Sequence, residues 1–160
     1  MELSTPAVRQ MIGLFRHLVA ELPPGTATLK VETGLKNAPN GTRLEVTPSV
    51  GQAARMVAMV LDRGTIFLTF GRAASFEFQV ECGDSIEASP FEEIETLSRA
   101  VIEGKIEEEL WVVGSQVFKG TARITLPTGT RTMHYRGSFH PVEKTEKQQV
   151  KYLPYRVSGK

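Results

Sequence analysis

A central run of apolar segments constrains the fold of this chain more than any other feature. Three short apolar runs, 56–61, 65–70 and 75–81, are separated by turns that contain Gly64 and Gly71. Short apolar runs joined by tight turns are typical of antiparallel strands that follow one another in a sheet. This part of the sequence therefore predicts a three-stranded antiparallel meander.

The first and third of these runs predict different surroundings. All residues of the run 56–61 are apolar, which predicts a strand covered on both faces. In the run 75–81, Phe76, Phe78 and Val80 alternate with polar residues. This period of two places one face of the strand on a core and the other face in water.

Two segments have the apolar spacing of amphipathic helices. The first can be capped by Ser4 or Thr5, and it stops at the Pro-Pro-Gly sequence 23–25. The second begins at a capping box, residues 89–92, and Gly104 suits its C-terminal end. Both segments therefore predict helices with one buried stripe.

Alternating patterns predict further strands on both sides of the second helix. Segments 26–32 and 43–47 predict a hairpin with a long loop, in which Asn40 and Gly41 form the turn signal. Three more alternating segments predict a second meander after the second helix: 105–113, 117–126 and 131–136.

Successive hairpins, rather than alternating strands and helices, indicate an α+β fold. We predict a mainly antiparallel sheet of about eight strands with two amphipathic helices packed on one face. A chain of 160 residues suits one domain, which we assign to residues 1–140. A basic C-terminal arm, 141–160, follows it and is either docked or partly disordered.

The composition excludes several classes of protein. No segment approaches the about 18 continuous apolar residues that span a bilayer, and the N-terminus lacks the pattern of a signal peptide. The single cysteine, Cys82, excludes an intramolecular disulfide and fits a reducing compartment. We therefore expect a soluble cytoplasmic protein that does not engage a membrane.

The formal net charge of +1 conceals two oppositely charged blocks. Residues 84–109 hold nine acidic and two basic residues, a local charge of −7, and residues 115–160 hold nine basic and two acidic residues, a local charge of +7. The blocks can meet within one fold, bind separate partners, or simply keep the surface solvated.

No residue pattern fixes a reaction. Cys82 could act as a nucleophile with His134 or His140 as its base, and the same histidines could join carboxylates in a metal site. The run Glu107 to Glu109 could serve acid–base chemistry, although at most Glu107 and Glu109 share a strand face. None of these has a diagnostic spacing, so we expect no catalytic residue, metal or cofactor, and lean towards a protein that is not an enzyme.

The leading hypothesis is a non-enzymatic module that binds a macromolecular partner, in the first place a protein, in an immunity-like or adaptor-like role. It depends on the segregated charge and on aromatic residues that can anchor an interface. Six residues are its candidate contacts: Trp111, Arg123, Arg131, His134, Tyr135 and Arg136.

Two other classes of function stay open. Four phenylalanines could line an apolar pocket between sheet and helix for a small ligand or a simple active site: Phe67, Phe70, Phe76 and Phe78. The basic C-terminal strands could bind nucleic acid if the bases between Arg123 and Arg136 share one uninterrupted face. Open sheet edges could also pair with a second copy in a homodimer.

Overall fold

The computed structural model describes residues 5–36, 38–61, 64–82, 85–86, 89–137 and 144–156. Its two helices are α1 (Pro6–Ala20) and α2 (Ser89–Ile102). The strands before α2 are β1 (Ala27–Leu35), β2 (Ala38–Pro48), β3 (Met56–Val60), β4 (Thr65–Phe70), β5 (Ala74–Gln79), β6 (Glu81–Cys82) and β7 (Ser85–Ile86). The strands after it are β8 (Ile106–Val113), β9 (Gln116–Leu126), β10 (Gly129–Arg136) and β11 (Glu146–Lys151).

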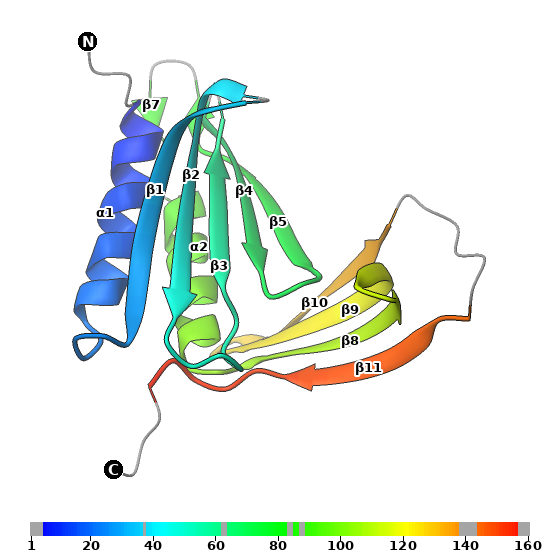
Figure 1. Cartoon of the computed structure of the whole chain (residues 1–160). Coiled ribbons are helices and arrows are strands. Elements are labelled where there is room, and N and C mark those ends of the chain that lie inside the picture. Colours follow the sequence, from blue (N-terminus) through cyan, green and yellow to red (C-terminus); the bar gives the residue numbers. More distant parts are fainter. Residues whose placement is uncertain are drawn as a thin grey trace.

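The strands form two main antiparallel sheets (Figure 1). The first has the sequential order β1-β2-β3-β4-β5, and the second has the order β10-β9-β8-β11, while β6 and β7 form a short separate ladder. The α+β class and the antiparallel pairing are confirmed, but the prediction of one sheet of about eight strands was wrong. After the first sheet the chain forms α2. It then begins a second sheet, in which β8 pairs with β9 and β11.

Both helices lie on one side of the five-stranded sheet (Figure 1). The predicted helical stripes are confirmed: Met11 and Phe15 of α1 and Ile94 and Leu97 of α2 are fully buried. They share one core with the inward residues of the sheet, such as Leu68. No helix in the part of the chain that the structure describes is long and apolar enough to cross a membrane.

Local sequence signals set the ends of the helices. Thr5 is the N-cap of α1, and its Oγ1 accepts a hydrogen bond of 3.3 Å from the backbone N–H of Val8. Gly104 follows α2 with a φ of +76°, in the left-handed region that favours glycine. A Cβ at Gly104 would also lie 2.5 Å from the backbone nitrogen of Pro154, so this position needs glycine for space as well.

The predicted turn at Asn40 and Gly41 was wrong. The hairpin turns between Leu35 and Ala38, which are paired, so β2 begins earlier and contains both residues. Gly41 is buried in the strand, where a Cβ would lie 3.0 Å from the Cβ of Ala38. Its glycine therefore serves a close approach within the sheet rather than a turn.

The prediction that the first apolar run is covered on both faces was also wrong. Met56, Ala58 and Val60 of β3 are buried, whereas Val57 and Met59 are only half-buried. The reason is that both helices pack on the same side of the sheet, so the opposite face has no helical cover (Figure 1).

The basic C-terminal segment contributes to the fold in residues 144–156. Strand β11 pairs with β8 in antiparallel register, from Glu146 opposite Val112 to Lys151 opposite Glu107. Further along, the ring of Tyr155 is buried in the main core, and its hydroxyl donates a hydrogen bond to the carbonyl oxygen of Ala54.

Candidate functional site

The outward face of the four-stranded sheet holds most of the contact residues that the sequence predicted. Trp111 of β8 pairs with Lys119 of β9, Lys119 pairs with Arg136 of β10, and Trp111 pairs with Lys147 of β11. One row across all four strands thus presents a tryptophan and three basic side chains. We call the outward side chains around this row the Trp111 face: Glu107, Glu109, Trp111, Lys119, Thr121, Arg123, His134, Arg136 and Lys147.

Two ammonium groups hold the indole of Trp111 in place. Lys119 Nζ lies 4.7 Å and Lys147 Nζ 5.6 Å from the centre of the Trp111 ring. Both distances are within the range in which a cation is attracted to the face of an aromatic ring. Lys147 Nζ also lies 3.0 Å from Glu109 Oε1, so the row is connected to the next residue pair along β8.

The rest of this face is also built from cross-strand polar pairs. Arg123 Nε lies 3.2 Å from Glu107 Oε1, and Thr121 Oγ1 lies 3.2 Å from His134 Nδ1. Pairs of this kind stabilise the sheet through contacts between neighbouring strands. They give His134 a structural partner on the surface.

A shallow hollow of about 420 Å³ opens on this face. It is lined by Trp111, Lys119, Gly120, Thr121, His134, Tyr135 and Arg136. The volume is within the range of ligand pockets, about 300–1,000 Å³, and its walls combine the aromatic rings of Trp111 and Tyr135 with the basic side chains of Lys119 and Arg136. The hollow therefore suits a charged surface group of a partner better than an apolar ligand.

Two cations at the hollow lack an acidic partner in the described part of the chain. Lys119 has a ring contact with Trp111, and Arg136 has a guanidinium 5.9 Å from the centre of the Phe118 ring, and neither forms an ion pair there. A cation without a carboxylate partner is free to attract an anionic group from outside. The hollow therefore combines an ordered aromatic ring with two uncompensated charges.

The structure places Arg131 away from the predicted contact residues on the Trp111 face. Arg131 and Tyr135 alternate to the other side of β10, where Arg131 Nη1 lies 2.6 Å from Glu93 Oε1 on α2. The guanidinium of Arg131 also lies 5.5 Å from the centre of the Phe76 ring. Tyr135 is 39% exposed and still borders the hollow from the edge strand.

The four predicted pocket phenylalanines do not share a cavity among the described residues. Phe70, Phe76 and Phe78 are core residues. The ring centres of Phe70 and Phe76 are 6.0 Å apart, and those of Phe76 and Phe78 are 6.3 Å apart. Phe67 points to the opposite face of β4 and is 37% exposed. Alternation along β4 causes this separation, because Phe67 and Phe70 differ by an odd number of residues.

The acidic run on β8 divides between the two sides of the sheet. Glu107 and Glu109 point outward and pair with basic residues, whereas Glu108 is 3% exposed and points inward. Its carboxylate accepts hydrogen bonds from the backbone N–H groups of Arg72 and Ala73 and from the hydroxyl of Tyr152. Glu108 thus joins the β4–β5 turn of the first sheet to the second sheet.

The other chemical candidates find no support in the described residues. The side chain of Cys82 and all of His140 lie outside them, and within them no three His, Cys, Asp or Glu residues are grouped to hold a metal ion. The pairing of Cys82 with a histidine base therefore lies outside the described part of the chain.

A second cavity, which the sequence did not indicate, lies where both helices end. It has a volume of about 400 Å³ and is lined by Leu18, Glu21, Leu22, Arg99, Ile102, Glu103, Pro154 and Arg156. These residues come from α1, α2 and the C-terminal segment, so only tertiary packing brings them together. No pattern within one segment of the sequence could have revealed it.

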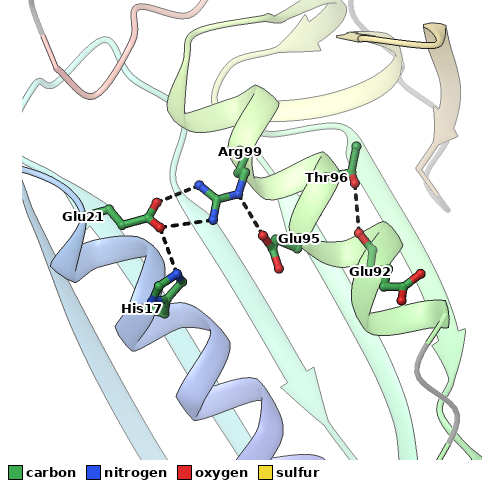
Figure 2. A network of polar contacts seen from close by, with 6 residues as sticks. All are labelled: His17, Glu21, Glu92, Glu95, Thr96 and Arg99. Carbon is green, nitrogen blue, oxygen red and sulfur yellow. Dashed lines mark hydrogen bonds and ion pairs between the residues drawn. The ribbon is translucent and has the colours of Figure 1, made fainter.

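The most prominent charge at this second cavity is already neutralised (Figure 2). Arg99 Nη1 lies 2.6 Å from Glu21 Oε2, Arg99 Nε lies 2.9 Å from Glu95 Oε2, and His17 Nε2 lies 2.8 Å from Glu21 Oε1. The hydrogen bond from Arg99 lowers the pKa of Glu21, and the hydrogen bond from Glu21 raises the pKa of Arg99. The network ties α1 to α2 and occupies the guanidinium of Arg99.

Comparison with known proteins provides no family for this chain. No model of a protein family matches its sequence, and neither a curated protein nor a solved structure matches it.

Proposed function

We propose that this protein is a non-enzymatic binding module that docks an acidic surface of a partner protein on the Trp111 face. The observation that carries the proposal is the row of Trp111, Lys119 and Arg136, which borders the hollow of about 420 Å³. Tryptophan and arginine are enriched at the energetic centres of protein interfaces. The basic side chains around the indole would select a partner with carboxylates.

The order of the indole favours this role. Lys119 and Lys147 flank the ring of Trp111 in the free protein and favour one orientation of it, so a partner that docks on it has less side-chain entropy to remove. The chain has a single tryptophan, and it lies at this site. Its fluorescence will therefore report directly on binding.

Two features favour a protein over nucleic acid as the partner. Glu107 and Glu109 lie on the Trp111 face and would repel a continuous phosphate backbone. In addition, Arg131 is turned away and paired with Glu93, so the bases between Arg123 and Arg136 do not share one uninterrupted face. A protein surface can place its carboxylates at separate points and accommodate this mixed pattern.

The proposal is tested by affinity capture from the source cells with three baits: the wild type, Trp111→Ala, and the double variant Lys119→Glu/Arg136→Glu. We expect the wild type to retain a partner protein at low salt and to release it as added salt screens the charges. Neither variant should retain this protein. Arg16→Glu is the matched control, because Arg16 is exposed on α1, which lies beside the five-stranded sheet (Figure 1), and this variant should retain the partner.

The captured protein, once purified, is then titrated against the fluorescence of Trp111. A saturable change in the wild type that is lost in Lys119→Glu/Arg136→Glu supports the proposal. Capture of the same proteins by all four baits contradicts it. A fluorescence response to single-stranded oligonucleotides that exceeds the response to the captured protein would favour nucleic-acid binding instead.

A further inference from the structure

We propose that the open face of the five-stranded sheet is the interface of a homodimer, in which a second copy of this chain covers it. This surface is separate from the Trp111 face and goes beyond the function proposed above. It lies on the side of the sheet opposite to both helices (Figure 1).

The open face has an apolar centre. Val57 and Met59 of β3 are half-buried there, and Phe67 of β4 is 37% exposed. Met59 and Phe67 are directly paired across the two central strands. Apolar side chains that gather at the middle of a sheet face, away from the core of the same chain, are typical of an interaction surface.

Charges flank this centre in a self-complementary order. One row crosses all five strands in register, and it reads Glu32, Arg43, Met59, Phe67 and Glu77. Arg43 and Arg55 share one carboxylate, Glu45, which leaves the β2 side with an excess of positive charge.

The opposite flank carries a negative charge. Glu77 on β5 is exposed and has no ion pair within the described residues. Arg43 and Glu77 therefore lie at equal distances from the centre of the row, each one strand beyond the Met59 and Phe67 pair, with opposite charges.

In the proposed dimer, a two-fold axis runs parallel to the strands, above the middle of the face between β3 and β4. It places Met59 of one copy over Phe67 of the other, and Arg43 of one copy over Glu77 of the other. Closed dimers commonly have such isologous contacts, in which the same patch of both subunits meets. Two sheets can pack in this way at a distance of about 10 Å with their strands nearly aligned.

The size of the face is sufficient for a weak dimer. Strands about 4.8 Å apart and residues about 3.3 Å apart give five strands of this length a face of about 500 Å² per copy. The total, about 1,000 Å², is at the lower limit of specific interfaces. We therefore expect a reversible dimer whose population rises with concentration over the micromolar range.

Light scattering after size exclusion, or sedimentation velocity, on the full chain tests the proposal. The wild type should pass from monomer to dimer as the concentration rises from low to several hundred micromolar. Arg43→Glu and Glu77→Arg should each weaken dimerisation by at least about tenfold, because each places like charges opposite one another. An equimolar mixture of these two variants should form a heterodimer, since both ion pairs can then form, one with the native charges and the other with the charges exchanged.

The controls separate this surface from the others. Arg16→Glu on α1 and Trp111→Ala on the second sheet should dimerise like the wild type. Circular dichroism of each variant verifies the fold, and heterodimer formation in the mixture shows independently that both single variants are folded. A wild type that stays monomeric at every concentration overturns the proposal, as does a dimer that both charge reversals leave unchanged, or variants whose mixture does not associate.

Discussion

The carboxylate of Glu108 accepts a hydrogen bond of 2.9 Å from the backbone N–H of Arg72, a residue that precedes it by 36 positions. The same carboxylate accepts hydrogen bonds from the N–H of Ala73 and the hydroxyl of Tyr152. A buried carboxylate is tolerated only when hydrogen bonds replace its hydration, and Glu108 has three donors. It therefore links the turn between β4 and β5, strand β8 and the C-terminal segment.

Glu108→Gln should destabilise the protein strongly. The amide replaces one carboxylate oxygen by an NH₂ donor, which would face a donor group of the chain and leave it without an acceptor. We expect a loss of about 2–4 kcal/mol in the free energy of unfolding, measured by urea denaturation. Glu109→Gln is the matched control: it removes a surface pair with Lys147 and should cost about 0–1 kcal/mol. Equal losses in both variants would contradict the role of Glu108.

Two tyrosines should resist ionisation while the protein is folded. Burial raises the pKa of Tyr152 above its ordinary value of 10.0, with a further contribution from Glu108, and burial raises the pKa of Tyr155. A raised folded-state pKa means that the stability contributed by the neutral phenol is present below pH 10 and is lost as the pH rises above it.

An alkaline titration of the phenolate absorbance tests this expectation. Two of the three tyrosines should ionise together with unfolding, which circular dichroism reports in parallel. Tyr152→Phe should reduce the amplitude of that step by one tyrosine. Ionisation of all three tyrosines before any loss of structure would rule the expectation out.

Removal of the hydroxyl of Ser98 should stabilise α2. Ser98 is fully buried, and its Oγ has no hydrogen-bond partner among the residues that the structure describes. Ser98→Ala removes the cost of an unsatisfied buried hydroxyl and improves helix propensity, so the free energy of unfolding should rise by about 1 kcal/mol.

Thr96→Ala is the matched control, because it removes a hydroxyl of the same helix that already has a hydrogen-bond partner. Its Oγ1 donates to the carbonyl oxygen of Glu92 at 2.9 Å on the exposed side of the same helix (Figure 2). Thermal melts of both variants should show the larger increase for Ser98→Ala. A decrease in the melting temperature of Ser98→Ala would mean that its hydroxyl has a partner after all.

Ion pairs between the helices and on the five-stranded sheet should make the stability of the protein depend on pH in the acid range. The hydrogen bond from Arg99 lowers the pKa of Glu21 below its ordinary value of 4.5, and the hydrogen bond from Arg43 does the same for Glu45. A lowered folded-state pKa contributes stability above pH 4.5, and this contribution is lost as the pH falls through the folded-state pKa.

The effect of Glu21 is isolated by comparing the wild type with Glu21→Gln over a series of pH values. Their difference in the free energy of unfolding should shrink as the pH falls below 4.5. High salt should reduce it at every pH, because both side chains are largely exposed. A difference that persists unchanged to low pH would show that Glu21 contributes through packing rather than charge.

Much of the fold was predictable because it depends on local signals. The cap at Thr5, the left-handed Gly104 and the alternation of Phe76 and Phe78 each act within a few residues, and the structure confirms them. The candidate site was predictable in part: Trp111, His134 and Arg136 share a face. Alternation along β10 also places Arg131 on the face opposite to His134 and Arg136. The sequence contains this distinction, but the prediction grouped all these residues because they lie in one segment.

The sequence by itself determined where the helices and most strands lie and which side chains of each share a face, because backbone periodicity and capping are local properties. Only the tertiary structure decided how the strands divide between two sheets, which face of β3 is left open and what Glu108 holds, since those outcomes depend on contacts between distant segments. Alternation places the middle carboxylate of the run Glu107 to Glu109 on the other strand face, but it does not say what that carboxylate contacts. Its role arises when folding brings Arg72 and Tyr152 to it.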